Sequence, residues 1–247
     1  LYWAVYALNT NGYNDGIRSA IVKHSFDYDF VGVNNYINKT IGQASDRTYA
    51  DIWVSENGSY SNGAYTLDYI ANGSVKHPFK TLDSAIICAS ISSGRVRFML
   101  QGGDYYIGTY NFQNCFIHFI GQTGSADGVT IHGLITAGYG STILTSYATL
   151  INDYTNAEII NINTDGYCFT ENTKFIRNTK GSIAVISAGI FKCINVSFNN
   201  FNECVQLQGG TVELFANVSV YDCNLVFHAY NKSEVKQVRI YRNVVTT

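Results

Sequence analysis

A repeat of 22 residues in the second half of the chain most constrains what this sequence can fold into. Four turn positions stand 22 apart (178 − 156, 200 − 178 and 222 − 200): Asn156, Asn178, Asn200 and Asp222. Three further columns keep this spacing: Tyr154, Ile176, Phe198 and Val220; Ile183, Val205 and Phe227; and Val185, Leu207 and Ala229. Each repeat holds two short alternating strands and a polar turn, a unit too small to bury its own apolar face, so copies must stack. The repeat therefore predicts a parallel β-helix, with one coil of the chain per repeat.

The length of the repeat excludes other common solenoids. Helical repeats need about 33 to 47 residues for their helix pairs, and the Leu-x-x-Leu-x-Leu frame of leucine-rich repeats is absent. Amides that recur at a coil corner can hydrogen-bond their equivalents in the coils above and below, which predicts a ladder of asparagines. The alternative interpretation is that asparagine is simply a common turn residue.

The composition agrees with an elongated β protein that has a neutral surface. The 247 residues include 19 Tyr, 22 Gly and a single Pro, only 14% of them are charged, and the net charge is −2. Without a run of Lys or Arg, a nucleic-acid site that follows the phosphates is not expected. No apolar stretch approaches the roughly 18 residues of a membrane span.

The ends and the cysteines bear on the origin of the chain. It begins at Leu1 and its only Met is Met99, so we expect a processed product or a piece of a longer polypeptide. The six cysteines fit neither a metal knuckle nor a compact disulfide framework. We interpret them as buried thiols of a protein assembled in a reducing compartment, with disulfides as the alternative. Two of the six glycosylation sequons, Asn195 and Asn217, are 22 apart (217 − 195), so the repeat accounts for these two without glycosylation.

Two domains are predicted. Residues 1–50 lack the repeat and form an entry or neck segment, in which Phe30, Val33, Ile37 and Ile41 have helical spacing. That short helix would lie on its own domain in a monomer, or pack about the axis of a trimer as a neck. Residues 51–247 form the β-helix domain. Within it, residues 81–93 have the pattern of a helix with Thr81 as N-cap, and we expect this helix to cap the first coil.

The opening of the β-helix domain resembles a known family. Ile52-Trp53-Val54-Ser55, then Gly58, then Pro78-Phe79-Lys80-Thr81-Leu82 with Ala85, and finally Gly103-x-Tyr105 match the start of many pectin-lyase-like right-handed β-helices. The resemblance covers roughly residues 51–107 and implies an all-β, single-stranded, right-handed parallel β-helix. It is a weak indicator of function, because the family includes polysaccharide lyases and hydrolases, epimerases, bacterial surface proteins, and the tailspikes and tail fibres of bacteriophages.

The residues give little sign of catalysis. Glycosidic hydrolysis needs two carboxyl groups about 5 to 9.5 Å apart, but the acids scarcely coincide on the 22-residue period, and the nearest stacked pair is Glu213 with Glu234. Asp153 and Glu158 could meet across a turn and are the fallback catalytic pair, although a solvated turn is the favoured interpretation. His118 and His228 are expected to be outward strand residues rather than bases. No metal or other cofactor is predicted.

Tyrosines and amides indicate carbohydrate binding more clearly. A sugar ring stacks on tyrosine while its hydroxyls pair with Asn, Gln and Ser. The richest local supply is Tyr60, Tyr65, Tyr69, Tyr105, Tyr106, Tyr110 and Tyr139, although strands and oligomer interfaces also use tyrosine heavily. No individual ligand-binding residue is assigned.

Together these features favour a tail-fibre or tailspike-like virion protein, structural and receptor-binding. The resemblance implies a homotrimer, with other tail proteins and a bacterial surface polysaccharide as partners, assembled in the host cytoplasm. The alternatives are a polysaccharide-degrading lyase or hydrolase that removes capsule or lipopolysaccharide, and a secreted or cell-surface bacterial adhesin.

Overall fold

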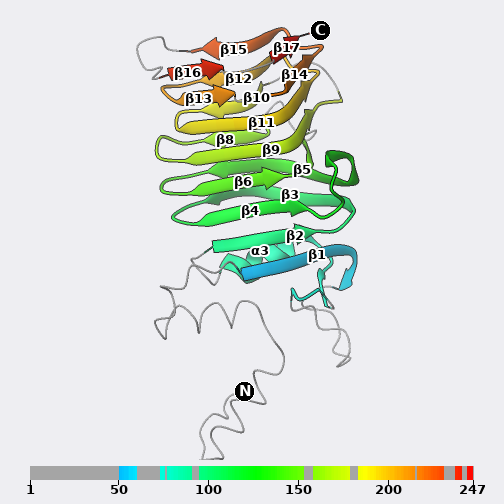
Figure 1. The fold of residues 1–247 in the computed structure, drawn as a ribbon. Helices are drawn as coiled ribbons and strands as arrows, with labels where there is room; N and C mark the ends of the chain where they lie inside the picture. Colours follow the sequence, from blue (N-terminus) through cyan, green and yellow to red (C-terminus); the bar gives the residue numbers. More distant parts are fainter. Residues whose placement is uncertain are drawn as a thin grey trace, which may run out of the picture.

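Parallel strands wind into a single elongated solenoid, as the repeat predicted (Figure 1). The computed structural model describes residues 50–59, 73–75, 77–90, 95–152, 158–178, 183–214, 216–230, 237–240 and 244–246. The predicted neck segment lies outside the described residues, apart from residue 50. Within the described part of the chain, no helix is long and apolar enough to cross a membrane.

The strands form three faces, each a ladder of parallel pairs. Face A comprises β1 (Ala50–Ser59), β2 (Arg95–Leu100), β4 (Phe116–Gly121), β6 (Thr142–Ser146), the first halves of β9 (Tyr167–Ile176) and β11 (Ile190–Asn199), β13 (Thr211–Leu214) and β16 (Gln237–Ile240). Face B comprises the first halves of β3 (Gly103–Phe112) and β5 (Val129–Ala137), β7 (Thr149–Ile151), the second halves of β9 and β11, β14 (Val218–Tyr221) and β17 (Val244–Thr246). Face C comprises the second halves of β3 and β5, β8 (Ile160–Ile162), β10 (Ile183–Ser187), β12 (Glu203–Leu207) and β15 (Leu225–Ala229). The predicted all-β parallel β-helix is therefore confirmed.

Long strands turn the corners between faces without leaving the ladder. The first half of β5 pairs with β7 on face B and its second half with β8 on face C, so β5 bends between His132 and Leu134. Gly133 occupies this bend with φ 136°, and a Cβ there would lie 2.0 Å from the carbonyl oxygen of Ile107 in the previous coil. Only glycine fits such a close approach of two backbones.

The register confirms part of the predicted repeat and corrects the rest. Phe198 lies over Val220, Val205 over Phe227 and Leu207 over Ala229, each at the predicted interval (220 − 198, 227 − 205, 229 − 207).

One coil earlier, the fixed spacing is wrong. Val185 rather than Ile183 pairs with Val205, and Phe175 rather than Ile176 pairs with Phe198. The reason is that the turns differ in length while the strands must keep their apolar side inward. An odd slip would turn the buried side chain out, and Ile176 indeed lies on the outer side of β9.

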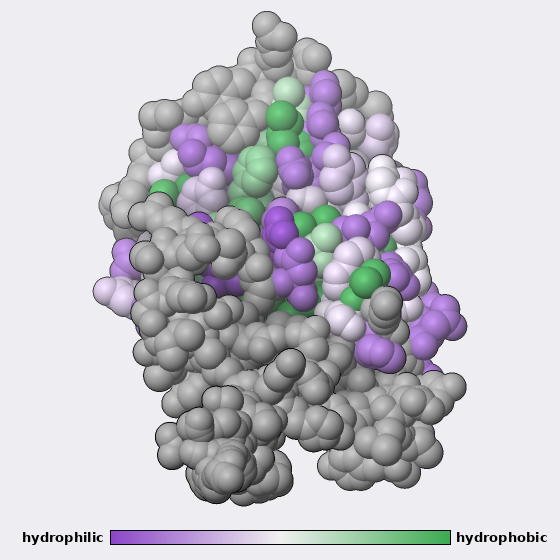
Figure 2. All heavy atoms as spheres, turned by 60° about the horizontal axis from the view of Figure 1, so that its bottom comes forward, coloured by the Kyte–Doolittle hydropathy of each residue, from purple (hydrophilic) through white to green (hydrophobic). Residues whose placement is uncertain are grey.

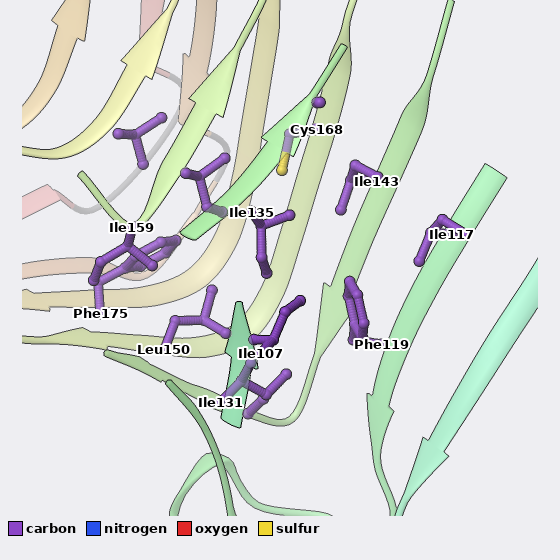
Figure 3. Packing of buried hydrophobic residues seen from close by; sticks show 14 of the residues in the cluster. Ile107, Ile117, Phe119, Ile131, Ile135, Ile143, Leu150, Ile159, Cys168 and Phe175 are labelled. Atoms are coloured by element: carbon purple, nitrogen blue, oxygen red, sulfur yellow. The ribbon is translucent and has the colours of Figure 1, made fainter. Parts of the chain in front are cut away.

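The interior is filled by like side chains stacked coil upon coil. Phe98 stacks on Phe119 with ring centroids 5.3 Å apart, and Phe175 on Phe198 at 4.8 Å. Figure 3 shows residues from several coils pointing into this shared interior, among them Ile131, Leu150 and Phe175 of face B and Ile143 and Cys168 of face A. Burial of each such side chain contributes about 1.5 to 3 kcal/mol, and it is available only when neighbouring coils are present.

The cysteines support the predicted burial of the thiols. Cys168, Cys193 and Cys204 are buried, Cys115 and Cys223 are half-buried, and all five are free thiols. Burial raises the pKa of Cys115 to about 11 and the pKa of Cys168 and Cys193 further. These protonated thiols act as small apolar side chains of the interior.

A helix covers the N-terminal end of this interior. Helix α3 (Leu82–Ser90) lies beside β1 and β2 in Figure 1, and its side chains Leu82, Ala85, Ile86 and Ala89 are buried. The Oγ1 of Thr81 accepts a hydrogen bond from the backbone N–H of Ser84 at 3.2 Å, which confirms Thr81 as N-cap.

The Gly-x-Tyr motif, Gly103-x-Tyr105, links the first coils of the solenoid. Gly103 has φ 147°, and a Cβ there would lie 2.5 Å from Cδ of Glu56. Tyr105 is 2% exposed, and its hydroxyl lies 2.7 Å from the carbonyl oxygen of Gln101 and 3.2 Å from that of Val54. Burial, helped by the nearby Glu56 carboxylate, raises the pKa of Tyr105 to about 12. The motif thus ties β1 to the start of β3.

We expect Tyr105→Phe to lower the free energy of unfolding by about 1 to 3 kcal/mol, because the hydrogen bonds from the buried hydroxyl to the carbonyl oxygens of Gln101 and Val54 are lost. Urea denaturation at pH 7 measures this, with the 65% exposed Tyr139 as the control in Tyr139→Phe. The folded protein keeps the Tyr105 proton up to about pH 12, whereas an unfolded chain loses it near pH ~10. The stability from this group is therefore complete below pH ~10 and lost as the pH rises further. Equal stability of the two variants would contradict the assignment.

Candidate functional site

A groove of about 360 Å³ follows the corner between faces A and B. Its lining combines small polar side chains, apolar groups and one cation: Gly124, Ser125, Ala126, Tyr147, Asn172, Thr173, Lys174, Asn195, Val196, Ser197, Asn217 and Ser219. These residues come from several successive coils, so the groove runs along the solenoid rather than around it.

One wall of the groove is an asparagine ladder. The Nδ2 of Asn195 donates to Oδ1 of Asn172 at 3.1 Å, and the Nδ2 of Asn217 donates to Oδ1 of Asn195 at 2.8 Å. All three residues have left-handed backbones, with φ of 47°, 52° and 52°. Asparagine adopts this conformation more readily than other residues with a side chain, which makes it suited to turning the strand from face A to face B. The ladder also explains the two sequons at Asn195 and Asn217.

Only the last step of the predicted column is in register: Asn199 pairs with Tyr221, which places Asn200 over Asp222. The Nδ2 of Asn200 donates to the backbone oxygen of Arg177 at 2.9 Å, and the N–H of Asn200 donates to the oxygen of Tyr221. Asn200 thus lies over Arg177 rather than Asn178, and Asn156 lies outside the described residues. The sequence analysis missed the column that does stack, whose two intervals differ by one (195 − 172 against 217 − 195). The sequon pair was the available signal for it.

A second column, two residues further along each strand than the ladder, carries hydroxyls and one ammonium group. Ser197 lies in register with Lys174 in the preceding coil and with Ser219 in the following coil. These side chains face outward, because their neighbours along each strand, such as Phe175 and Phe198, are buried.

A loop closes the end of the groove nearest the N-terminus. It leaves β4, contains the short helix η2 (Ala126–Gly128) and projects beside β5 in Figure 1. The Oγ of Ser125 caps η2 by accepting from the N–H of Asp127 at 3.3 Å. Lys174 forms an ion pair with Asp127, and its hydrogen bond and charge hold the pKa of that carboxyl below its usual range. The Asp127 carboxyl is therefore charged at neutral pH.

These groups can bind but are poorly arranged for chemistry. Amides, hydroxyls and a lysine–aspartate pair offer both donors and acceptors, the combination that a sugar hydroxyl requires. The groove contains neither a carboxylate pair nor a cysteine or histidine among its lining residues. Within the described part of the chain, no three His, Cys, Asp or Glu side chains gather as metal ligands.

The fallback catalytic pair remains untested, since Asp153 lies outside the described residues. Oε1 of Glu158 accepts a hydrogen bond from Nδ2 of Asn161 at 2.7 Å. The other candidate acid, Glu213, is buried beside Lys192, whose Nζ lies 2.8 Å from its carboxylate. In register, Glu213 faces Arg239 in the next coil, while Glu234 also lies outside the described residues.

His118 belongs to a hydrogen-bonded chain that resembles a catalytic triad only in composition. Its Nε2 lies 2.8 Å from Oγ of Ser146, and that hydroxyl donates to Oε1 of Glu171 at 2.9 Å. Because Ser146 gives its hydrogen to Glu171, it must accept from His118, so His118 acts as donor rather than base. Ser146 is also 3% exposed. The chain therefore joins three coils of face A, and His118 is an outward strand residue as predicted.

His228, the other histidine singled out from the sequence, also lies on the outside. Its Nδ1 lies 2.9 Å from Oε1 of Glu203, and it pairs in register with Gln206. The Nε2 of Gln206 donates to the other carboxylate oxygen of Glu203 at 3.1 Å. The side chains of this small polar cluster on face C bond to one another, and the cluster is remote from the groove.

The tyrosines divide between core and surface. Tyr105 is buried, so it presents no ring for a sugar to stack on, and Tyr110 is half-buried against the core. Tyr106 and Tyr139 are exposed, and the ring of Tyr106 stacks on His132 at 4.5 Å. Tyr60, Tyr65 and Tyr69 lie outside the described residues. The exposed Tyr221 and Tyr230 were missed, because a repeat period does not say which side of a strand faces out.

The described surface lacks a large apolar area on the face that Figure 2 shows. Hydrophilic and hydrophobic residues are interspersed there. A surface of this kind suits many hydrogen bonds better than one hydrophobic anchor.

We expect the stability of the protein to fall as the pH decreases from 6.5 to 4. Burial, together with the charge of Arg97, lowers the pKa of His118 to about 4, whereas an unfolded chain takes up this proton near pH ~6.5. The contribution is thus complete above pH ~6.5 and lost as the pH falls through that range. Urea denaturation at pH 5 and pH 7.5 measures it, and His118→Gln, which keeps a donor to Ser146, should show a smaller difference. An NMR titration with His118 near its ordinary pKa would contradict this.

Comparisons with known proteins identify the fold. No protein-family model and no curated protein sequence matches the chain. Among solved structures, the pectin methylesterase PemA from Erwinia chrysanthemi aligns with a TM-score of 0.51 and 15% identity, over 81% of this chain and 66% of that chain. The pectin methylesterase from Aspergillus niger in deglycosylated form aligns with a TM-score of 0.37 and 8% identity, over 81% of this chain and 87% of that chain. At this identity the likeness to PemA concerns the fold alone, which is that of a right-handed parallel β-helix.

Proposed function

We propose that this protein is a carbohydrate-binding β-helix module of the bacteriophage tail-fibre or tailspike type. Its ligand would be a bacterial surface glycan, held in the groove between faces A and B. The observation that carries the proposal is the polar part of this groove: a column of stacked amides beside a column of aligned hydroxyls, with no pair of carboxylates among the lining residues.

The chemistry of the groove favours a neutral glycan. Asn195, Ser197 and Ser219 offer uncharged donors and acceptors, while the charge of Lys174 is balanced by that of Asp127. The whole chain has a net charge of −2 and few ionised groups. A strongly acidic polymer would meet no compensating field here.

Rigidity adds to the binding energy. The groove walls are part of the backbone ladders of successive coils, and the amides of the asparagine ladder hold one another in place. A site that is already ordered loses little entropy when a ligand binds. Weak contacts of this kind become effective when several copies of the site act together, which is the benefit of a homotrimer on a virion. Other tail proteins would then be further partners.

Two alternative functions can each be tested by a separate experiment. A solved structure that shares this fold is named a pectin methylesterase, so a polysaccharide-degrading enzyme remains the second candidate. Incubation with capsule or lipopolysaccharide, followed by assay for new reducing ends or unsaturated products, tests it. A secreted adhesin, monomeric and disulfide-bonded, is the third, and a titration of free thiols in the unfolded, unreduced protein tests that one.

We expect Ser197→Trp to weaken binding of a neutral surface polysaccharide by at least about tenfold, or roughly 1.4 kcal/mol, because the indole would fill the groove. Isothermal titration calorimetry with purified polysaccharides from candidate hosts measures this. Thr211→Trp is the matched control, since Thr211 lies on the outer side of face A at a comparable strand position. Equal affinities of the two variants would place the binding site elsewhere and contradict the proposal.

We expect the full chain to form a trimer in solution. A trimer has three times the 27.3 kDa mass of one chain, and size-exclusion chromatography with light scattering distinguishes the two masses. A mass of one chain at all concentrations would contradict the trimer and favour the adhesin.

A further inference from the structure

The groove differs at its two ends, and this asymmetry bears on which part of a glycan it holds. The inference rests on the proposed function, namely that a neutral glycan occupies the groove. The end nearest the N-terminus is closed by the loop that contains η2. The coils of β11 and β14 have no such loop within the described part of the chain.

The loop is fixed across successive coils rather than left free at the surface. The Oγ1 of Thr149, one coil further along, donates to the backbone oxygen of Ala126 at 2.8 Å. Lys174, two coils further along, pairs with Asp127. The loop thus leaves the coil of β4 and β5 and reaches the level of β9, directly in the path of the groove. It is a stop that two different strands hold in place.

In the coils that follow the loop, the corner between faces A and B is short. β11 passes from face A to face B through a single residue, Asn195, without an insertion. The outward side chains there, Ser197 and Ser219, are small. Equivalent polar groups therefore repeat at the spacing of one coil, about 4.8 Å, in a straight line that leads away from the loop.

The groups at the closed end differ from those along the line. Ser125, Asp127 and Lys174 place a hydroxyl, a carboxylate and an ammonium group together, whereas the line carries only amides and hydroxyls. We infer that the groove recognises the terminus of a linear neutral glycan. The last sugar would lie against the loop, and the chain would run along the asparagine ladder, parallel to the solenoid axis.

The volume of the groove fits this assignment. At about 360 Å³ it lies near the lower limit of small-ligand sites, which is roughly 300 Å³. Recognition of an internal segment would instead need a groove open at both ends.

Chain length provides the test. One neutral surface polysaccharide that binds the wild-type protein is separated into a long and a short pool with the same repeating unit. Calorimetric titration then counts binding sites per gram. We expect the number of sites per gram to rise from the long to the short pool by the same factor as the number of chain ends, with an unchanged affinity per site. The same number per gram in both pools would mean internal binding and would overturn the inference while leaving the proposed function intact.

A variant pair checks that the closed end makes the contact. Lys174→Ala should weaken binding of the short pool by about tenfold, whereas Lys192→Ala, which removes an ion-paired lysine from face A, should leave it unchanged. Circular dichroism and thermal unfolding confirm that both variants fold. Equal affinities would contradict the role of the closed end. If the wild-type protein binds no pool of any polysaccharide, the proposed function itself fails, and this inference with it.

Discussion

The structure depends on the parallel hydrogen bonding of each coil to the next. Every strand pairs residue by residue with equivalent strands in adjacent coils, from β1 with β2 to β14 with β17. This pairing fixes a spacing of about 4.8 Å between coils and requires that each inward position lie over another inward position. The core is therefore a set of columns, such as Ile131, Leu150, Phe175 and Phe198, rather than a cluster drawn from distant parts of the sequence.

The corners follow from the same constraint, because a chain that turns sharply while it stays in register brings backbones close together. At the corner between faces C and A, a Cβ on Gly189 would lie 2.2 Å from the oxygen of Gly166, and a Cβ on Gly210 would lie 2.5 Å from the oxygen of Gly189. At the corner between faces A and B, asparagines with left-handed backbones take the equivalent role and add hydrogen bonds between their side chains. The candidate groove exists because this second kind of corner presents amides to the surface. Structure and proposed binding thus share one set of residues.

The acids show why this fold does not by itself imply catalysis here. Glu171, Glu203 and Glu213 each contact a serine, a histidine or a lysine that another coil supplies. Stacking brings unlike polar groups together along a face, so each of these carboxylates is engaged in a hydrogen bond or an ion pair. Two acids would need adjacent columns on neighbouring coils to work as a catalytic pair, and none of these three contacts joins two acids. A binding role uses the remaining amides and hydroxyls as they stand.

The sequence by itself determined the class of fold. Alternation of apolar residues within short strands, a recurring interval between like residues, the Thr81 cap and the Gly103-x-Tyr105 motif are local patterns, and local patterns are sufficient when each coil contacts only its neighbours. The sequence did not determine the register between coils, since turn lengths vary and parity alone decides whether Ile176 or Phe175 faces the core.

The groove could not be predicted from the sequence, because its position also depends on the register between coils. Asn172, Asn195 and Asn217 form a wall only once unequal coils are aligned, and Lys174 meets Asp127 across 47 residues of chain (174 − 127). The sequence pattern was sufficient to predict that successive coils stack on one another. Which side chains meet on the outside was decided by the tertiary structure, because outward positions carry no burial constraint that would leave a readable pattern.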